Sequence, residues 1–316
     1  MPSDRKIATV FGGSGFLGRY VVQRLAALGY IVRIGVRDPE SAKILQPMGD
    51  VGQIVPLYAP VADVEAVARA VEDAELVINL AGILVEHRKG DFFRTHEDGA
   101  GRIAHLAHAE GVKRLIHISA IGADAASASA YAQSKALGEA AVHAGFPGAV
   151  ILRPSIMFGA EDNFFNRFAA MATLFPMLPI VHGATKFQPV YVGDVADAVI
   201  ASIGGHAGQT FELGGPEVKS FAELLAIMLE IIGRPCRVWD MPVGLARLQA
   251  SLLERLPGKL LTNDQIILLE HDNVVAAGAP GLESLGIAPT RMDLILPGYL
   301  ARYRVGGKGR EAVFRE

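Results

Sequence analysis

Cysteine is almost absent from this chain of 316 residues, in which Cys236 has no second cysteine to pair with. A single cysteine excludes an intramolecular disulfide and argues against a metal cluster held by thiolates. Because only Met1 to Lys6 precede the first predicted strand, we expect neither a secretory signal nor a transit peptide. The chain is therefore expected to work in a reducing compartment.

Long apolar runs and excess positive charge are missing as well. No uninterrupted apolar stretch reaches the 18 or so residues that a membrane-spanning helix needs, so no span is expected. The formal net charge is -3 and the isoelectric point lies near 6.3, which argues against nucleic acid as the main partner. The length suffices for one large domain or for a domain with a smaller lobe.

Glycine, in contrast, is concentrated where the first apolar run ends. After residues 8–11 the chain has Gly12, Gly15 and Gly18, and apolar residues then resume at helical spacing. In a strand–turn–helix unit the first glycine permits the turn, the second lets the backbone approach a pyrophosphate, and the third lets the helix pack on the strand. The diphosphate would lie at the positive end of the helix dipole. The alternative is a purely structural turn in an α/β fold.

The same turn supplies further candidate cofactor contacts. These are Ser14, Phe16, Leu17 and Arg19.

Short apolar strands alternate with amphipathic helices through the first half of the chain. Strands are predicted at residues 31–36, 53–57, 76–81, 114–119 and 149–153, and helices between them at 61–71 and 99–110. This alternation predicts a doubly wound α/β fold, with a parallel sheet covered by helices on both faces.

The rhythm changes after about residue 154. Proline, glycine and aromatic residues become dense at 158–189, and helices are predicted at 221–232 and 243–256. We therefore predict a dinucleotide-binding domain at 1–157, to which 187–205 return. Residues 158–186 and 206–316 are predicted to form a smaller lobe over the carboxyl ends of the strands, where open α/β sheets bind ligands.

The second strand ends in Arg37 and Asp38, where such folds contact the adenosine ribose. An acidic residue there suits the two hydroxyls of NAD, whereas an arginine suits the 2′-phosphate of NADP. Because the arginine comes first, we expect NADP(H) to be preferred over NAD(H), with Arg37 as the main phosphate ligand and Arg19 as a helper. The alternative is a solvated strand end in which Arg37 pairs with Glu40.

Tyr131 and Lys135 lie four residues apart on a predicted helix and therefore on one face. A nearby ammonium favours the phenolate and lowers the pKa of a tyrosine towards that of a useful general acid or base. This pair is our candidate catalytic group.

With these motifs the chain resembles the extended and atypical short-chain dehydrogenases/reductases. The matching stretches are the glycine turn, 80–82, the Tyr131–Lys135 pair, 152–155, 188–196 and 211–216. The resemblance implies a Rossmann sheet of the extended short-chain dehydrogenase type with a smaller C-terminal lobe. It adds cofactor contacts at Leu80, Ala81, Gly82, Ser119, Pro154 and Ser155.

Two positions depart from the pattern of active members of that family. Ile121 occupies the place of a hydroxyl that would hydrogen-bond the substrate oxygen, and His96 replaces a frequent asparagine. An apolar side chain cannot stabilise an oxyanion, and the loss of one such donor typically costs about a hundredfold in rate. Ser127 or Ser129 are the candidates for a substitute hydroxyl.

One branch of the family is more similar than the others: the nucleotide-binding accessory subunits of respiratory complex I. The stretches that carry this resemblance are 8–22, 77–80, 116–119, 158–164, 188–192 and 280–287. It implies a tightly held structural NADPH, weak or no turnover, and other complex I subunits as partners. It also implies a peripheral place at the membrane, on the cytoplasmic face in a bacterium.

Two stretches and the histidines leave open questions. Residues 168–181 are almost wholly apolar, which fits either a buried loop and helix over the cofactor or an exposed patch that meets a membrane or subunit. The basic stretch 302–310 is expected to be a loose tail, either docking or solvated. His105, His108 and His117 lack companion ligands, so no metal is predicted.

Three functions remain open from the sequence. The chain is an accessory subunit, an active NADPH-dependent reductase or epimerase of a sugar or small carbonyl compound, or a nucleotide-sensing binding protein. The fold alone does not choose among them, but Ile121 and His96 favour the first.

Overall fold

The computed structural model describes residues 6–253 and 261–306, and within them two compact units. The first unit comprises Met1–Pro154, Gly193–Leu213 and Ala277–Ala288. The second comprises Ser155–Val192, Gly214–Ala276 and Pro289–Glu316.

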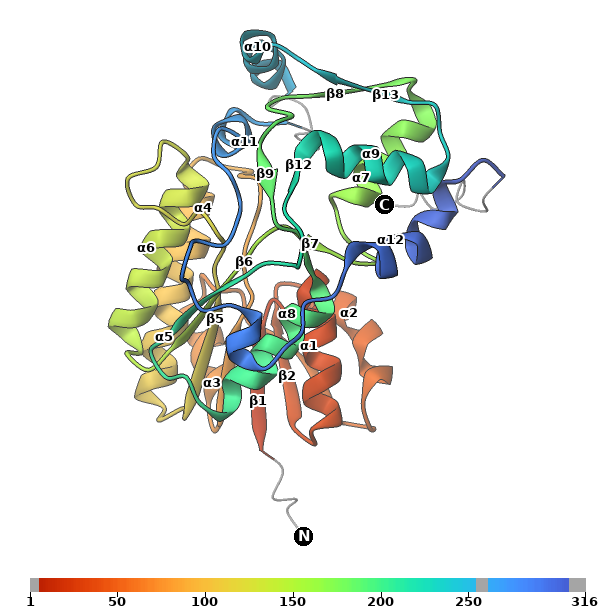
Figure 1. The fold of residues 1–316 in the computed structure, drawn as a ribbon. Coiled ribbons are helices and arrows are strands. Elements are labelled where there is room, and N and C mark those ends of the chain that lie inside the picture. The colour runs from red at the N-terminus through yellow and green to blue at the C-terminus, as the bar shows by residue number, and fades with distance from the viewer. Residues whose placement is uncertain (1–5, 254–260, 307–316) are drawn as a thin grey trace. The chain divides into compact units, whose positions relative to one another are not determined.

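A seven-stranded parallel sheet forms the centre of the first unit (Figure 1). Its order is β11-β6-β5-β4-β1-β2-β3. The strands are β1 (Ile7–Phe11), β2 (Ile31–Val36), β3 (Ile54–Tyr58), β4 (Leu76–Asn79), β5 (Arg114–Ile118), β6 (Val150–Pro154) and β11 (Thr210–Leu213). Since the order reverses on either side of β1, the carboxyl ends of β1 and β4 form the switch point at which such sheets bind ligands.

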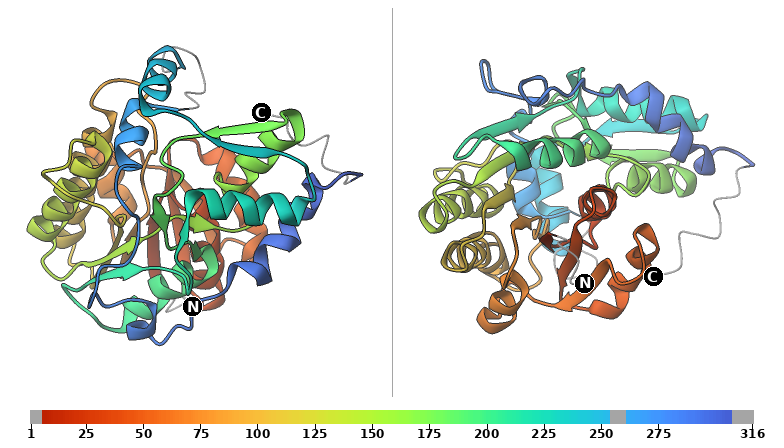
Figure 2. Two further views of the ribbon diagram at one scale, coloured as in Figure 1. Left: turned by 45° about the horizontal axis from the view of Figure 1, so that its top comes forward. Right: turned by 90° about the horizontal axis from the view of Figure 1, so that it is seen from below.

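Helices cover both faces of this sheet, as the two views of Figure 2 show. On one face, α3 (Val64–Val71), α5 (Gly99–Ala109) and α6 (Ala130–Gly145) enclose an apolar core with Phe11, Val77 and Leu115. On the other, α1 (Phe16–Ala27) is joined to α8 (Val192–Ala201) by an ion pair between Arg24 and Asp197 at 2.6 Å.

Polar side chains at the helix starts explain why these helices begin where they do. The Asp63 carboxylate accepts the N–H of Ala66 at the start of α3, and the Ser129 hydroxyl accepts that of Ala132 at the start of α6. Such caps satisfy backbone donors that the helix itself leaves unpaired. The shorter elements of the unit are α2 (Pro39–Ala42), η1 (Lys43–Met48), α4 (Asp91–Phe93), η2 (Arg94–Asp98), η3 (Ser202–Gly204) and η4 (Leu282–Leu285).

Among its described residues, the second unit has its own core and three two-stranded sheets. The pairs are β7 (Met157–Phe158) with β10 (Val190–Tyr191), β9 (Lys186–Phe187) with β12 (Lys219–Ser220), and β8 (Met177–Ile180) with β13 (Arg237–Asp240). Its helices are α7 (Phe165–Leu174), α9 (Phe221–Ile232), α10 (Val243–Leu253), α11 (Asn263–Leu268), α12 (Met292–Leu300) and η5 (Ala301–Tyr303). Phe158, Leu224 and Leu296 belong to one buried cluster that α7, α9 and α12 share.

The doubly wound α/β fold predicted from the sequence is confirmed, and the predicted strands agree with the observed ones to within two residues. The predicted helix 243–256 is observed as α10 up to Leu253, and its last residues lie outside the described part. The division of the chain differs from the predicted one: residues 206–213 and 277–288 lie in the first unit. The reason is that β11 pairs with β6, and the Glu212 amide donates to the Pro280 carbonyl.

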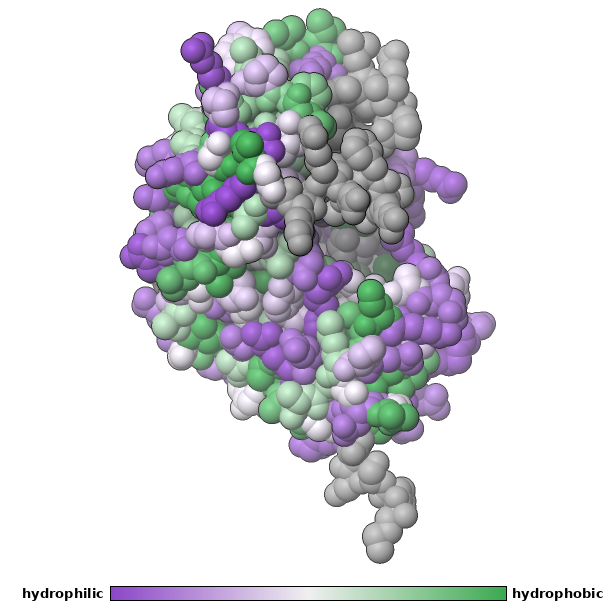
Figure 3. Space-filling view, turned by 90° about the vertical axis from the view of Figure 1, so that its right-hand side faces the viewer, coloured by the Kyte–Doolittle hydropathy of each residue, from purple (hydrophilic) through white to green (hydrophobic). Residues whose placement is uncertain are grey.

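The apolar stretch 168–181 divides between core and surface. Ala169, Leu178 and Ile180 are buried in the core of the second unit, whereas Phe175 and Met177 are about half exposed. Neither interpretation of the sequence therefore holds for the whole stretch. On the face that Figure 3 shows, hydrophilic and hydrophobic residues are interspersed.

The beginning of the basic stretch 302–310 is anchored, contrary to the expected loose tail. Arg302 donates to the side chain of Asn166, Tyr303 is buried, and Arg304 donates to the carbonyl of Ile231. Residues 307–310 lie outside the described part. Within that part, no helix is long and apolar enough to cross a bilayer.

Candidate functional site

The glycine turn after β1 has the geometry that its sequence predicts. Gly12 has a φ of +74°, and a Cβ there would lie 3.0 Å from the backbone of Leu80 and Ala81. At Gly18 a Cβ would lie 2.4 Å from the carbonyl oxygen of Gly13, an impossible contact. Both positions therefore require glycine. Gly12 requires it because of its positive φ and the nearby backbone of Leu80 and Ala81, and Gly18 because α1 packs closely on the turn.

Gly15 is different, because little of the protein lies beside it. It is exposed, and a Cβ at this position would have one atom within 4 Å, the Gly12 oxygen at 3.2 Å. Gly15 is also the N-cap of α1, with extended backbone and no side-chain cap. The first amides of α1 are therefore left without a side-chain cap, and the helix dipole favours an anion there.

The remaining predicted contacts of the turn lie in this first helical segment. Ser14, Phe16 and Arg19 are half-buried beside Gly15, while Leu17 is buried against the sheet.

At the end of β2, Arg37 is exposed and Asp38 has a structural task. The Asp38 carboxylate caps α2 by accepting the amide of Glu40 at 3.0 Å. Glu40 pairs with Lys43 at 2.7 Å, and no ion pair of Arg37 exists within residues 6–253 and 261–306. The alternative pairing of Arg37 with Glu40 is therefore not observed.

The ends of β4 and β5 are joined by buried polar side chains. The Asn79 oxygen accepts the amide of Ala81 at 3.0 Å, so its Nδ2 donates to His117 Nδ1 at 3.1 Å. Burial, and after it the charge of Lys135, keeps the pKa of His117 well below its usual range. This pair fixes the path of Leu80, Ala81 and Gly82, the chain that contacts Gly12.

Tyr131 and Lys135 lie on α6, as predicted. The ammonium of Lys135 is buried and donates to the carbonyl of Ile118 at 2.9 Å, so it is held against the end of β5. Burial lowers the pKa of Lys135 to about 8, although the carboxylate of Glu139 acts in the opposite direction. A lysine whose pKa lies near neutrality can exchange a proton with a neighbouring phenol.

Two aromatic side chains enclose the ring of Tyr131. Phe92 from α4 meets it edge-on at 5.6 Å between ring centroids, and His96 from η2 at 5.5 Å. Phe92 and His96 also stack on each other at 5.7 Å. The position of the Tyr131 ring is therefore set by packing as well as by α6.

His96 is fixed in one neutral tautomer by its hydrogen bonds. Its Nε2 accepts the amide of Ile83 at 3.0 Å, so Nδ1 carries the proton and donates to the hydroxyl of Ser134 at 2.9 Å. The Ser134 hydroxyl in turn donates to the carbonyl of Tyr131. Burial, followed by the charge of Lys135, lowers the pKa of His96 to about 3. Both ring nitrogens are thus occupied by structural contacts.

Ser119 and Ile121 follow β5. The Ser119 hydroxyl is buried and has no hydrogen-bond partner among the described residues, which suits a position that meets a bound ligand. Ile121 is buried, and its amide donates to the carbonyl of Pro154 at 3.1 Å. The unpartnered hydroxyl, the open helix start and the glycine cradle all fit a dinucleotide.

The candidate substitute hydroxyls have local roles. Ser129 is buried and caps α6, and the Ser127 hydroxyl accepts the amide of Ser129 at 3.1 Å. Ser155 belongs to the second unit, where its hydroxyl donates to the side-chain oxygen of Asn273 at 2.7 Å.

Sequence reasoning missed Phe92, Ser134 and the partner of Asn79. These contacts join residues 38 positions apart in two cases, His96 with Ser134 and Asn79 with His117. The sequence signal for such a contact is a small polar residue, Ser134, one turn after the tyrosine on the same helix. No group of three or more potential metal ligands occurs in the part of the chain that the structure describes.

Comparisons with known proteins agree with this geometry. The profile of the NAD dependent epimerase/dehydratase family matches residues 8–214. "NADH dehydrogenase [ubiquinone] 1 alpha subcomplex subunit 9, mitochondrial" of Arabidopsis thaliana is 36% identical over 316 aligned residues, which cover 95% of this chain and 79% of that protein. The protein of the same name from Rattus norvegicus is 37% identical, with 94% and 80% covered.

Solved structures with the same fold have lower sequence identity. An NADPH-dependent quinone oxidoreductase of Escherichia coli, complexed with NADPH, superposes with a TM-score of 0.72 at 19% identity, covering 93% of this chain and 99% of that one. At this identity the likeness concerns the fold alone.

Proposed function

Because the chain belongs to the NAD dependent epimerase/dehydratase family, we propose that it is an NADP(H)-binding accessory subunit of respiratory complex I. The observation that carries the proposal is the extent of the similarity. The alignments to subunits named for NADH dehydrogenase cover 94–95% of the chain, and so include both compact units. The partners are then the other subunits of the complex, and the chain is peripheral, on the cytoplasmic face of a bacterial membrane.

The bound nucleotide is proposed to be NADPH rather than NADH. Arg37 is exposed at the tip of β2 without an ion pair inside the described ranges, whereas the Asp38 carboxylate is used to cap α2. A guanidinium suits the 2′-phosphate, and a carboxylate engaged in capping is less suited to the ribose hydroxyls of NAD. Arg19, on α1, is proposed as the helper of Arg37.

The nucleotide contacts are proposed motif by motif. The diphosphate is assigned to the turn residues Gly12, Ser14, Gly15, Phe16, Leu17 and Gly18, and the 2′-phosphate to Arg37 with Arg19. The remainder is assigned to Leu80, Ala81, Gly82, Ser119, Tyr131, Lys135, Pro154 and Ser155. A nicotinamide, when bound, supplies a hydride.

Turnover is proposed to be weak or absent. His96 is held neutral with both ring nitrogens engaged, so it cannot relay a proton as a water-bound side chain would. Ile121 offers no hydroxyl to a substrate oxygen. The cofactor would then stabilise the fold, since a ligand that binds only the native state adds free energy of unfolding.

Affinity purification from native membranes tests the accessory role. A tagged chain is expected to recover respiratory subunits that carry flavin and iron–sulfur clusters, together with NADPH. Recovery of the tagged chain free of every such subunit would contradict the proposal.

An NADPH-dependent reductase is the second candidate, and one observation favours it. Tyr131 and Lys135 lie on one helix face, with the pKa of Lys135 lowered to about 8 by burial, as a proton-transferring pair requires. Steady-state NADPH oxidation with a simple carbonyl or quinone, abolished by Tyr131→Phe, would establish this activity instead.

A further inference from the structure

A loop with three consecutive exposed basic residues follows β4 in the first unit. Residues 83–90, here called the basic loop, contain His87, Arg88 and Lys89 in succession, and all three are exposed. The sequence places two acids at or beside this loop, Glu86 and Asp91, so its composition alone suggests near neutrality. The structure separates the two signs of charge.

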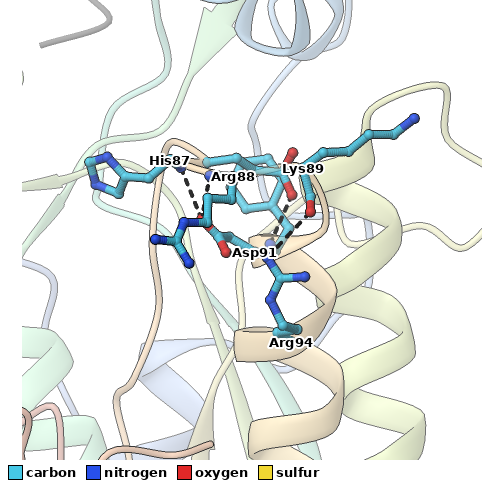
Figure 4. A network of polar contacts seen from close by, with 7 residues as sticks. His87, Arg88, Lys89, Asp91 and Arg94 are labelled. Carbon is cyan, nitrogen blue, oxygen red and sulfur yellow. Dashed lines mark hydrogen bonds and ion pairs between the residues drawn. The ribbon is translucent and has the colours of Figure 1, made fainter. Parts of the chain in front are cut away.

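The carboxylates are turned towards the backbone of the loop. Asp91 Oδ2 accepts the amides of His87 at 3.1 Å and Arg88 at 2.6 Å, and Glu86 Oε1 accepts the amide of Phe92 at 3.0 Å (Figure 4). These bonds hold the pKa of Asp91 below its usual range, the amide of Arg88 contributing most. The acids thus accept backbone amides of the loop and of α4, whereas His87, Arg88 and Lys89 are exposed.

The remaining charge of Asp91 is balanced from inside the unit. Arg94 forms an ion pair with it and also donates to the Lys89 carbonyl at 3.3 Å. Arg88 and Lys89 form no ion pair with any of residues 6–253 and 261–306, and Figure 4 shows the Lys89 side chain pointing away from the network. Two full positive charges therefore face outward without an internal counterion.

The loop is also joined to the candidate site near both of its ends. The Ile83 amide donates to His96, and Phe92, at the other end, packs on Tyr131. Beside the cations lies Leu84, whose side chain is 65% exposed. A backbone fixed at both ends, with cations around an exposed apolar residue, is preorganised for a specific protein contact, whereas a lipid-binding polybasic segment needs no fixed geometry.

We propose that the basic loop, with Arg88, Lys89 and Leu84, is a docking surface for an acidic segment of a protein partner. The inference rests on the proposed accessory role, because that role supplies the partner. Arg88 and Lys89 meet carboxylates of the partner, and Leu84 is covered by the same contact. Complementary charge of this kind sets orientation and makes association sensitive to salt.

Charge reversal in the assembled complex tests the proposal. The tagged chain is recovered from native membranes as wild type, as Arg88→Glu/Lys89→Glu, and as Lys186→Glu/Arg237→Glu. This control has the same change in net charge, at exposed cations that also form no ion pair within the described ranges. We expect recovery of respiratory subunits to fall about tenfold for the basic-loop variant and to stay unchanged for the control. The melting temperature and NADPH affinity of the purified chains should be the same.

The outcomes separate the two proposals. A wild-type chain that recovers no respiratory subunit overturns the accessory role and this inference with it. Equal recovery by wild type and the basic-loop variant overturns the inference alone. A loss of NADPH affinity in that variant also overturns it, because the loop would then serve the nucleotide.

A zero-length carbodiimide cross-link identifies the contact directly, since it joins an ammonium to a carboxylate at contact distance. In the assembled complex Lys89 is expected to cross-link to an aspartate or glutamate of another subunit, and Lys89→Arg to assemble normally without that cross-link. Absence of any cross-link at Lys89 overturns the proposal. Binding of the chain to vesicles of phosphatidylcholine and phosphatidylglycerol in equal parts also overturns the proposal if the double reversal abolishes that binding. The partner would then be a lipid surface.

Discussion

The phosphate end and the tyrosine end of the candidate site are built on different principles. At the phosphate end the protein leaves space: Gly15 has open surroundings, and the start of α1 has no side-chain cap. At the tyrosine end it fills space, because Phe92 and His96 pack on Tyr131, and Lys135 is tied to the carbonyl of Ile118. The candidate site is thus open at one end and closely packed at the other.

The strongest test of this contrast removes the open cradle. Gly15→Val places a side chain where the pyrophosphate would lie. Its Cβ would have one protein atom within 4 Å, the Gly12 oxygen at 3.2 Å, so we expect the chain still to fold. The loss of two charge-assisted hydrogen bonds to the pyrophosphate should weaken NADPH binding about a hundredfold or more, which calorimetry measures. The stabilisation of about 2.7 kcal/mol expected at a hundredfold excess of ligand over its dissociation constant should vanish.

Gly205→Val is the matched control, because Gly205 has extended backbone and nothing within 4 Å of a side chain. It should bind NADPH normally. If Gly15→Val bound no NADPH yet assembled into fully active complex I, the nucleotide would not be what makes the chain competent as a subunit.

The next effect concerns which nucleotide the open end accepts. Arg37→Ala should weaken NADPH binding by about tenfold, because one exposed charge-assisted hydrogen bond to the 2′-phosphate is lost, and leave NADH unchanged. Arg37→Lys keeps the charge and should fall between. Equal affinity of the wild type for the two nucleotides in calorimetry would refute the assignment.

The neutral His96 at the tyrosine end predicts how the stability of the protein depends on pH. His96 takes up a proton at about pH 3 in the folded chain but near 6.5 when unfolded. The unfolded state therefore binds more protons between these values, and stability is lost as the pH falls through this window. His117, whose pKa is also lowered, contributes in the same direction.

His96→Asn keeps an acceptor for the Ile83 amide but removes one titrating group. The free energy of unfolding should then fall less steeply with acid, by up to about 1.4 kcal/mol per pH unit. Denaturant titrations between pH 6.5 and pH 4 measure it. Identical slopes in wild type and variant would show that His96 is not held neutral.

The smallest effect is expected from repairing one catalytic position. Ile121→Ser restores a hydroxyl near the end of β5, but His96 remains engaged with Ile83 and Ser134. NADPH oxidation with aldehydes, sugars and quinones should rise by less than the roughly hundredfold that one donor is worth in an intact site. High turnover of the unmodified chain would show that the tyrosine end of the site is catalytically competent despite its close packing.

The sequence predicted what is encoded locally. The Gly12, Gly15 and Gly18 spacing, the strands and the Tyr131–Lys135 helix depend on neighbours within one or two turns, and they are observed. The pairings of His96 with Ser134 and of Asn79 with His117 could not be predicted, because both form between segments that only the folded sheet brings together.

The same reason explains the differences at the surface and in the division of the chain. Glu86 and Asp91 read as ordinary acids until their backbone partners are known. The strand at 210–213 reads as part of a later lobe until its pairing with β6 is seen.

The late position of β11 in the sequence has a consequence for synthesis of the protein and for truncated forms of it. The β6 edge of the sheet stays unpaired until the ribosome has synthesised Thr210–Leu213. The hydrogen bond between Glu212 and Pro280 forms only after still later residues have been synthesised. Meanwhile Arg153 lacks Glu212 as one of its two acidic partners. Nascent chains that stop short of this point expose an unpaired strand edge, which invites aggregation. A truncated form that ends after β6 should therefore be insoluble, although it contains the glycine turn and the tyrosine–lysine pair.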